Sequence, residues 1–114
     1  MMDASTTVAA LREIVHRFVE DRDWEAYHNP KDLAVALSIE ASELLERFLW
    51  REAPRGNEIP PEERAAIVEE LADVVIYALH FANAIQTDVS DAVAAKTAKN
   101  EAKYAADRFR GRTR

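Results

Sequence analysis

The chain has 114 residues, of which 15 are basic and 21 acidic, and its formal net charge is −6 at pH 7. This length predicts one domain with a single modest core. The acidic balance disfavours a nucleic-acid polymer as a partner. The absence of cysteine excludes disulfides, thiolate metal sites and cysteine nucleophiles. Two glycines and four prolines leave few turns, and the abundance of helix-forming residues favours an all-α fold.

The first ten residues show no basic stretch followed by an apolar one, so no signal peptide is expected. The longest apolar stretch, 71–85, is interrupted by polar residues and is too short to span a bilayer. These features predict a cytoplasmic protein without a membrane partner. We expect one domain over 1–114, with flexible ends at 1–6 and 110–114.

The first two of four predicted helices lie in the N-terminal half. The first covers about 7–21, where apolar residues recur at helical spacing. A loop at 22–29 follows. The second helix covers about 30–51, because Asn29 can cap it and Pro30 suits the first helical position.

The other two predicted helices follow a clear turn. The segment 53–61 contains one glycine and three prolines, which favours a turn. The third helix covers about 61–86. Asp88 or Ser90 then caps the fourth helix, which is expected to run to about residue 109.

Two pairs of carboxylates flank the apolar stripes of the second and third helices. At 100° per residue, Glu40 lies roughly 60° and Glu43 roughly 120° to one side of the second helix's stripe. Glu70 lies roughly 100° to the same rotational side of the third helix's stripe, and Asp73 lies somewhat further round. A short connection makes the two helices antiparallel, so both pairs should converge on one side. At about 1.5 Å per residue, the pairs are level to within about one turn.

Four carboxylates beside a core repel one another and are costly to desolvate. A divalent cation would relieve both costs, and an all-oxygen ligand set favours Mg²⁺ or Mn²⁺. A chain with 21 acids also contains such spacings by chance on solvated helix faces, so the spacing alone leaves both interpretations open. A di-iron carboxylate bundle is disfavoured because it needs Glu-x-x-His on partner helices.

Five stretches of the sequence together form a recognisable pattern. They are Arg22-Asp23-Trp24, the run His28-Asn29-Pro30-Lys31-Asp32-Leu33, Glu40 through Trp50, Glu69 through Tyr77, and Lys96, Asn100 and Tyr104 at four-residue steps. The pattern resembles the MazG-like, all-α nucleoside triphosphate pyrophosphohydrolases, and most closely the branch containing dCTP pyrophosphatases. The resemblance covers about residues 11–104.

The resemblance implies an antiparallel four-helix unit that assembles into a homo-oligomer, a tetramer or a dimer. It implies Mg²⁺-dependent hydrolysis of (deoxy)nucleoside triphosphates between the α- and β-phosphates, in nucleotide-pool house-cleaning, with a preference for dCTP or a modified pyrimidine nucleotide. Mn²⁺ could replace Mg²⁺. The implied metal ligands and catalytic residues are Glu40, Glu43, Glu70 and Asp73. One of these acids, or Glu46 or Glu69, would accept the proton.

The same resemblance implies which residues bind the substrate. Facing the base and sugar would be Trp24, His28, Trp50 and Tyr77, and near the phosphates Lys31, Lys96, Asn100 and the hydroxyl of Tyr104. Trp50 could instead plug the end of the second helix, and His28 could be a residue of the capping loop. His16 and His80 are expected on helix surfaces.

One alternative belongs to a different functional class. A helical nucleotide-binding or scaffold protein without catalytic activity would carry the same acids as a solvated helix face. Binding of Mg²⁺ together with a nucleotide distinguishes the enzyme from the scaffold.

Overall fold

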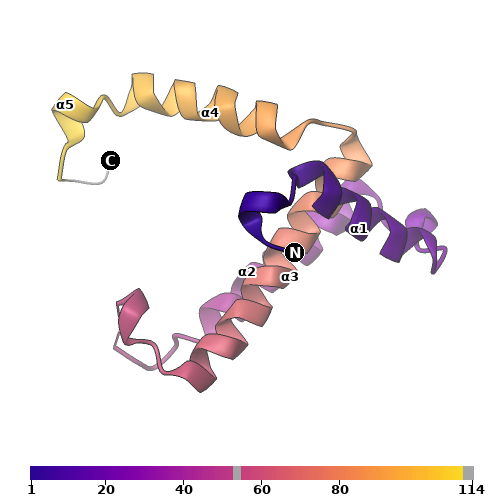
Figure 1. Cartoon of the computed structure of the whole chain (residues 1–114), viewed down its shortest axis with the longest axis horizontal. Coiled ribbons are helices and arrows are strands. Elements are labelled where there is room, and N and C mark those ends of the chain that lie inside the picture. The colour runs from indigo at the N-terminus through magenta and orange to yellow at the C-terminus, as the bar shows by residue number, and fades with distance from the viewer. Residues whose placement is uncertain (53–54, 112–114) are drawn as a thin grey trace.

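The computed structural model describes residues 1–52 and 55–111, and all regular secondary structure in those ranges is helical. The longer helices are α1 (Val8–Glu20), α2 (Pro30–Glu46), α3 (Pro61–Ile85) and α4 (Val89–Lys103) (Figure 1). The shorter elements are η1 (Asp3–Ser5), η2 (Glu25–Tyr27), η3 (Gly56–Glu58) and α5 (Ala106–Phe109). The predicted all-α class is confirmed. Among the described residues, no helix combines the length and apolar character that a bilayer crossing requires.

Side-chain caps set the starts of α2 and α4. Asn29 Oδ1 accepts a hydrogen bond from the N–H of Asp32 at 2.8 Å, so the predicted cap is present. At α4, a carboxylate oxygen of Asp88 accepts from the N–H of Asp91 at 2.8 Å. Of the two predicted caps, Asp88 is therefore the one used, and Ser90 lies inside the helix.

Two helices end earlier than their apolar pattern predicts. α2 ends at Glu46, short of residue 51, and turns follow it until Trp50 adopts a left-handed backbone conformation with φ of 63°. Such a conformation cannot continue an α-helix. α4 ends at Lys103, short of residue 109, because the backbone at Tyr104 leaves the helical region before α5 begins.

Some predicted boundaries fall partly outside the described residues. Of the predicted turn, residues 53 and 54 lie outside them, and the remainder contains η3. The predicted flexible N-terminal segment contains η1. At the other end, residues 112–114 lie outside the described residues.

α2 and α3 form an antiparallel pair, as predicted. Their direction is evident from two ion pairs that follow each other down the helix pair. The guanidinium of Arg47 lies 3.0 Å from Glu70 Oε1, and Arg51, later in the chain, pairs with the earlier residue Glu63. α1 packs across α3 on another side (Figure 1).

The core of the single chain is small. Its buried apolar side chains come from α1, the start of α2 and the end of α3: Val15, Val19, Leu33, Leu79 and Ala82. Many large apolar side chains on α2 and α3 are about half exposed, among them Val35, Ile39, Leu45, Val68, Leu71 and Val75. The helix pair therefore keeps apolar surface that its own chain does not cover.

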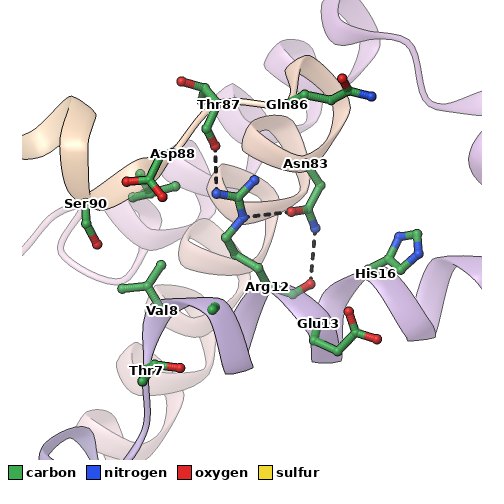
Figure 2. A pocket seen from close by; sticks show the side chains of 12 residues that line it. Thr7, Val8, Arg12, Glu13, His16, Asn83, Gln86, Thr87, Asp88 and Ser90 are labelled. Carbon is green, nitrogen blue, oxygen red and sulfur yellow. Dashed lines mark hydrogen bonds between the residues drawn. The ribbon is translucent and has the colours of Figure 1, made fainter.

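α4 leaves the end of α3 and runs away from the other three helices (Figure 1). Three hydrogen bonds link α1 to the end of α3 and to the turn from which α4 starts (Figure 2). Arg12 Nε donates to Asn83 Oδ1 at 2.9 Å and Arg12 Nη1 to the carbonyl of Thr87 at 2.6 Å. The Asn83 amide donates back to the carbonyl of Arg12 at 3.1 Å. The main helix contacts are α2 with α3 and α1 with α3, so the predicted four-helix unit is not closed within one chain.

Candidate active site

Carboxylates from α2 and α3 meet at one side of the helix pair. One carboxylate oxygen from each of Glu40, Glu43 and Glu70 lies within 4.8 Å of the other two, and all three side chains are half-buried. Asp73, one turn after Glu70, is close enough for its charge to act on Glu40. The four predicted acids therefore gather as three clustered groups with the fourth beside them.

Glu40 is the most perturbed member of this cluster. Its Oε2 atom is buried and has no hydrogen-bond partner among the described residues. Burial raises the pKa of Glu40 to about 7, and the hydrogen bond that the protonated carboxyl donates to Glu43, together with the charges of Glu43, Asp73 and Glu70, adds to the effect. A buried carboxylate oxygen that lacks a donor is well suited to a hard cation. The oxygen-only donor set therefore fits Mg²⁺ or Mn²⁺.

A polar cavity of about 500 Å³ opens beside the cluster, lined by Glu43, Glu46, Arg47 and Glu70. The Arg47 guanidinium donates to Glu70 Oε1 at 3.0 Å and supplies positive charge at this wall. Sequence reasoning did not select Arg47. Its position four residues after Glu43 on the same side of the helix is the signal that would have found it.

A second cavity of about 270 Å³ lies between α1, η2 and α3. Its aromatic walls are Phe18, Trp24, His28, Tyr77 and His80. The rings of Phe18 and Trp24 meet edge-to-face at 5.8 Å between centroids, and those of Trp24 and His28 at 6.1 Å. We call this cavity the aromatic pocket. Three of the predicted base-facing residues therefore lie together.

Asp73 connects the aromatic pocket to the carboxylate cluster. Its side chain lines the pocket, and its charge acts on Glu40. Tyr77 follows it by one turn of α3 and lines the same pocket. The two halves of the candidate site therefore share one helix and one carboxylate.

The two histidines of the aromatic pocket form a pair. His28 Nδ1 lies 2.7 Å from His80 Nε2, within hydrogen-bond distance. The expectation that His80 lies on a helix surface is wrong, because its ring is half-buried against a loop that the helix pattern does not describe. Burial lowers the pKa of His80 below the usual value for histidine. Its position three residues after Tyr77 placed it on the pocket side of α3.

The other predicted substrate residues do not reach the carboxylates in the single chain. Trp50 is 98% exposed, so it does not plug the end of α2. Lys31 is exposed in the first turn of α2. Lys96 and Asn100 are exposed on α4, and Tyr104 is half-buried just beyond it. Since α4 runs away from α2 and α3, its residues Lys96 and Asn100 do not approach the acids within the chain (Figure 1).

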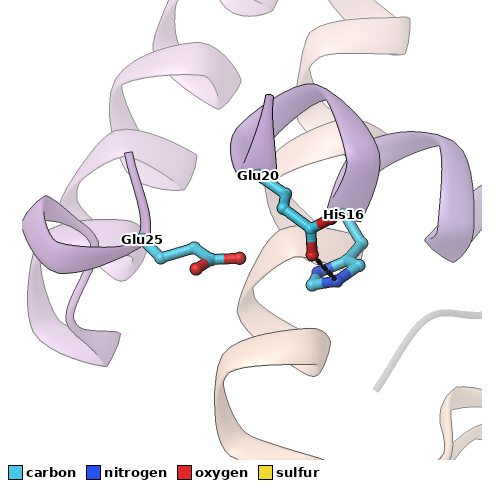
Figure 3. Close-up of side chains that lie close together, drawn as sticks. All are labelled: His16, Glu20 and Glu25. Atoms are coloured by element: carbon cyan, nitrogen blue, oxygen red, sulfur yellow. Dashed lines mark ion pairs between the residues drawn. The ribbon is translucent and has the colours of Figure 1, made fainter. Parts of the chain in front are cut away.

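A further group of possible metal ligands lies on the surface (Figure 3). His16, Glu20 and Glu25 approach one another, but all three are exposed. The 3.0 Å pair between His16 Nε2 and Glu20 Oε2 joins residues one turn apart on α1. It is typical of a solvated helix surface, where His16 was expected.

Comparison with known proteins identifies the family. The MazG-like family model matches residues 35–113. The chain is 38% identical to dCTP pyrophosphatase 1 of Mus musculus over 107 residues, covering 92% of this chain and 63% of that protein. It is 37% identical to dCTP pyrophosphatase 1 of Homo sapiens over 110 residues, covering 95% of this chain and 65% of that protein. The chain thus spans less than two thirds of the length of these curated relatives.

A solved structure shows the same fold. The crystal structure of a pyrophosphatase from Archaeoglobus fulgidus superimposes with a TM-score of 0.79 at 36% identity. The match covers 92% of this chain and 98% of that one. The likeness therefore extends over nearly the whole archaeal chain, in contrast to the longer mammalian relatives. This chain belongs to the MazG-like family.

Proposed function

We propose that this protein hydrolyses nucleoside triphosphates between the α- and β-phosphates, releasing a nucleoside monophosphate and pyrophosphate. The observation that carries the proposal is the cluster of Glu40, Glu43 and Glu70 joined through Asp73 to an aromatic pocket. The cluster suits a cationic partner for the phosphates, and the pocket suits a base. The names of the relatives, dCTP pyrophosphatase and pyrophosphatase, support the same reaction.

In this proposal Glu40, Glu43, Glu70 and Asp73 hold Mg²⁺, or Mn²⁺ in its place. The bound cation would neutralise the triphosphate and lower the pKa of a coordinated water. Arg47 holds Glu70 in position through their 3.0 Å ion pair. The proton acceptor is one of the four acids, or Glu46, which lines the polar cavity beside the cluster, or Glu69, which precedes Glu70 in the chain.

The aromatic pocket would receive the nucleobase. Trp24 and Tyr77 offer ring faces for stacking, and His28 offers a ring nitrogen for hydrogen bonding. Asp73 at the junction fixes where the pocket ends and the phosphate region begins. We propose a preference for dCTP or a modified pyrimidine nucleotide, and a cytoplasmic role in nucleotide-pool house-cleaning.

We also propose that the protein is a homo-oligomer, a tetramer or a dimer, whose sites lie near subunit contacts. The support is the uncovered apolar surface of α2 and α3 and the extended position of α4 (Figure 1). A neighbouring subunit could bring Lys96, Asn100 and Tyr104 to the phosphates. Size-exclusion chromatography with light scattering is expected to show at least a dimer, and a monomer would contradict the proposal.

The decisive experiment is incubation with a panel of dNTPs and NTPs plus Mg²⁺, with all products resolved. We expect pyrophosphate and the nucleoside monophosphate. Release of orthophosphate would rule out this reaction. A scaffold protein would neither hydrolyse nucleotides nor bind them with Mg²⁺, so calorimetry with Mg²⁺ and a non-hydrolysable dNTP separates that alternative.

A further inference from the structure

The aromatic pocket, the carboxylate cluster and the polar cavity follow one another along the α2–α3 pair. Going back along α3, Tyr77 and Asp73 line the pocket, and Glu70 belongs to the cluster and also lines the polar cavity. A further cavity of about 260 Å³ reaches Glu63, near the start of α3. Spacings of three and four residues keep these positions on one side of the helix. The polar cavity therefore lies beyond the cluster as seen from the aromatic pocket.

Arg47 is the cation of the polar cavity. The other described residues that line it are carboxylates, namely Glu43, Glu46 and Glu70. Arg47 Nη2 donates to Glu70 Oε1 at 3.0 Å, and the other N–H groups of the guanidinium have no partner among the described residues. A guanidinium has five N–H donors in a planar fork, so most of them stay available to a ligand.

The exposure of the two partners is unequal. The side chain of Glu70 is 15% exposed and that of Arg47 is 46% exposed. Glu70 therefore anchors the guanidinium from within the site, while a ligand that enters from solvent can reach its outer donors. The planar fork of arginine matches the oxygens of a phosphate group.

The neighbouring Arg51 has a different role. It pairs with Glu63, and its Nη1 donates to the carbonyl of Arg47 at 3.3 Å. It lines the further cavity rather than the polar cavity, one helical turn farther from the cluster. Arg51 thus supports the backbone from which Arg47 extends, and Arg47 is the arginine beside the carboxylates.

The order of these sites fixes the direction in which a nucleotide would lie. With its base in the aromatic pocket and its α-phosphate at the carboxylate cluster, its β- and γ-phosphates point toward the polar cavity. When water attacks the α-phosphorus, the bond from that phosphorus to the bridging oxygen breaks and its electron pair stays on pyrophosphate. The proton of the water passes to the acceptor carboxylate. Negative charge therefore develops on the side of the cluster where Arg47 lies.

We propose, building on the proposed function, that Arg47 binds the β- and γ-phosphates of the substrate and then the departing pyrophosphate. A fixed positive charge at that position stabilises the charge that the leaving group acquires. Three of the four lining residues are acidic, so pyrophosphate should bind only together with Mg²⁺.

The test measures binding of pyrophosphate by calorimetry at saturating Mg²⁺, in the wild type and in Arg47→Gln. Kd for pyrophosphate should rise at least about tenfold in the variant, the usual effect of losing a hydrogen bond between charged groups. The product dCMP ends at the α-phosphate and should bind both proteins equally. Arg47→Lys keeps the charge without the planar fork, so its Kd for pyrophosphate should fall between the other two.

The same experiment separates phosphate binding from mere support of Glu70. If Arg47 acted only through Glu70, Arg47→Gln would weaken the binding of Mg²⁺ alone, and dCMP and pyrophosphate would weaken together. We expect Mg²⁺ alone to bind Arg47→Gln no more weakly than the wild type, because loss of a positive charge beside the acids favours a cation. The matched control is Arg17→Gln, which removes a guanidinium paired with Glu13 at 2.9 Å on α1 and should leave the pyrophosphate Kd unchanged.

Three results would overturn the proposal. They are a wild type that does not bind pyrophosphate with Mg²⁺, a pyrophosphate Kd that Arg47→Gln does not change, and equal weakening of pyrophosphate and dCMP. Binding is measured without turnover, so the outcome is separate from that of the proposed reaction. If the protein hydrolyses no triphosphate but binds pyrophosphate through Arg47, the reaction is wrong and the phosphate site stands.

Discussion

The two halves of the candidate site are built in opposite ways. The carboxylate half is made by two long helices that run side by side, and its residues follow one another at single-turn steps. The aromatic half is made by α1, the η2 loop and α3, with ring contacts between residues far apart in sequence. The first concentrates negative charge, whereas the second is largely apolar. In the proposed function, metal binding by the carboxylate half and base recognition by the aromatic half should therefore be separable, although both halves depend on α3.

The largest expected effect is on the carboxylate half. Glu43→Gln keeps the shape of the side chain and removes one negative charge from the proposed cation site. kcat should fall at least about a hundredfold, as when a group that stabilises the transition state is lost. KM should change far less, since the aromatic pocket is untouched. Steady-state kinetics with dCTP and Mg²⁺ measures both constants.

Glu62→Gln is the matched control for this variant. It removes one charge from the exposed first turn of α3, outside the cluster. Its kcat should stay near that of the wild type. If Glu43→Gln kept the activity of the wild type, Glu43 would not be part of the proposed cation site.

The opposite result is expected in the aromatic half. Trp24→Ala removes a ring that contacts both Phe18 and His28. KM should rise about tenfold, because stacking of one base on an aromatic ring contributes roughly 1–3 kcal/mol. kcat should stay within about twofold if the two halves are separable. Tyr27→Ala, an exposed residue of the same loop, is the control and should change neither constant.

The raised pKa of Glu40 makes stability depend on pH in a defined direction. The folded state holds this proton up to about pH 7, whereas the unfolded chain releases it near the ordinary value of 4.5. The stabilisation is therefore fully present below about 4.5 and is lost as pH rises through about 7. Without metal, Tm should fall over that window, and Glu40→Gln should flatten the fall.

Mg²⁺ should reverse this loss, because a bound cation favours the carboxylate and replaces the proton. Calorimetry at pH 7 in buffers of different ionisation enthalpy should detect about half a proton released per site. Metal binding without proton release would show that Glu40 is not part of the cation site.

The smallest effect concerns the support of the aromatic half. Thr7 Oγ1 caps α1 by accepting the N–H of Ala10 at 3.0 Å, and α1 forms one wall of the aromatic pocket. Thr7→Ala should cost about 1 kcal/mol of stability and lower Tm by about 4 °C. Mg²⁺ affinity should be unchanged, because α2 and α3 hold the acids. Ser5→Ala, which lies before α1, is the control; a weakened Mg²⁺ affinity in Thr7→Ala would show that the halves are coupled.

The same contrast explains what could be predicted from the sequence. The carboxylates were placed correctly because helical periodicity and a short antiparallel connection determine their positions. His80 was misplaced because its partner His28 lies on a loop, and periodicity does not describe how a loop folds back. The early end of α2 was missed because the apolar pattern continues to Trp50, while its left-handed backbone conformation depends on the turn that follows.

α4 has a consequence for how the protein depends on its own concentration. It spans 15 residues and has little tertiary support within the chain. An isolated helix of this length is only marginally stable in water. If subunits supply the missing contacts, helix formation in α4 and association are one equilibrium. Dilution would then reduce the helix content of α4, which carries Lys96 and Asn100. The activity per molecule would therefore fall as the protein concentration is lowered.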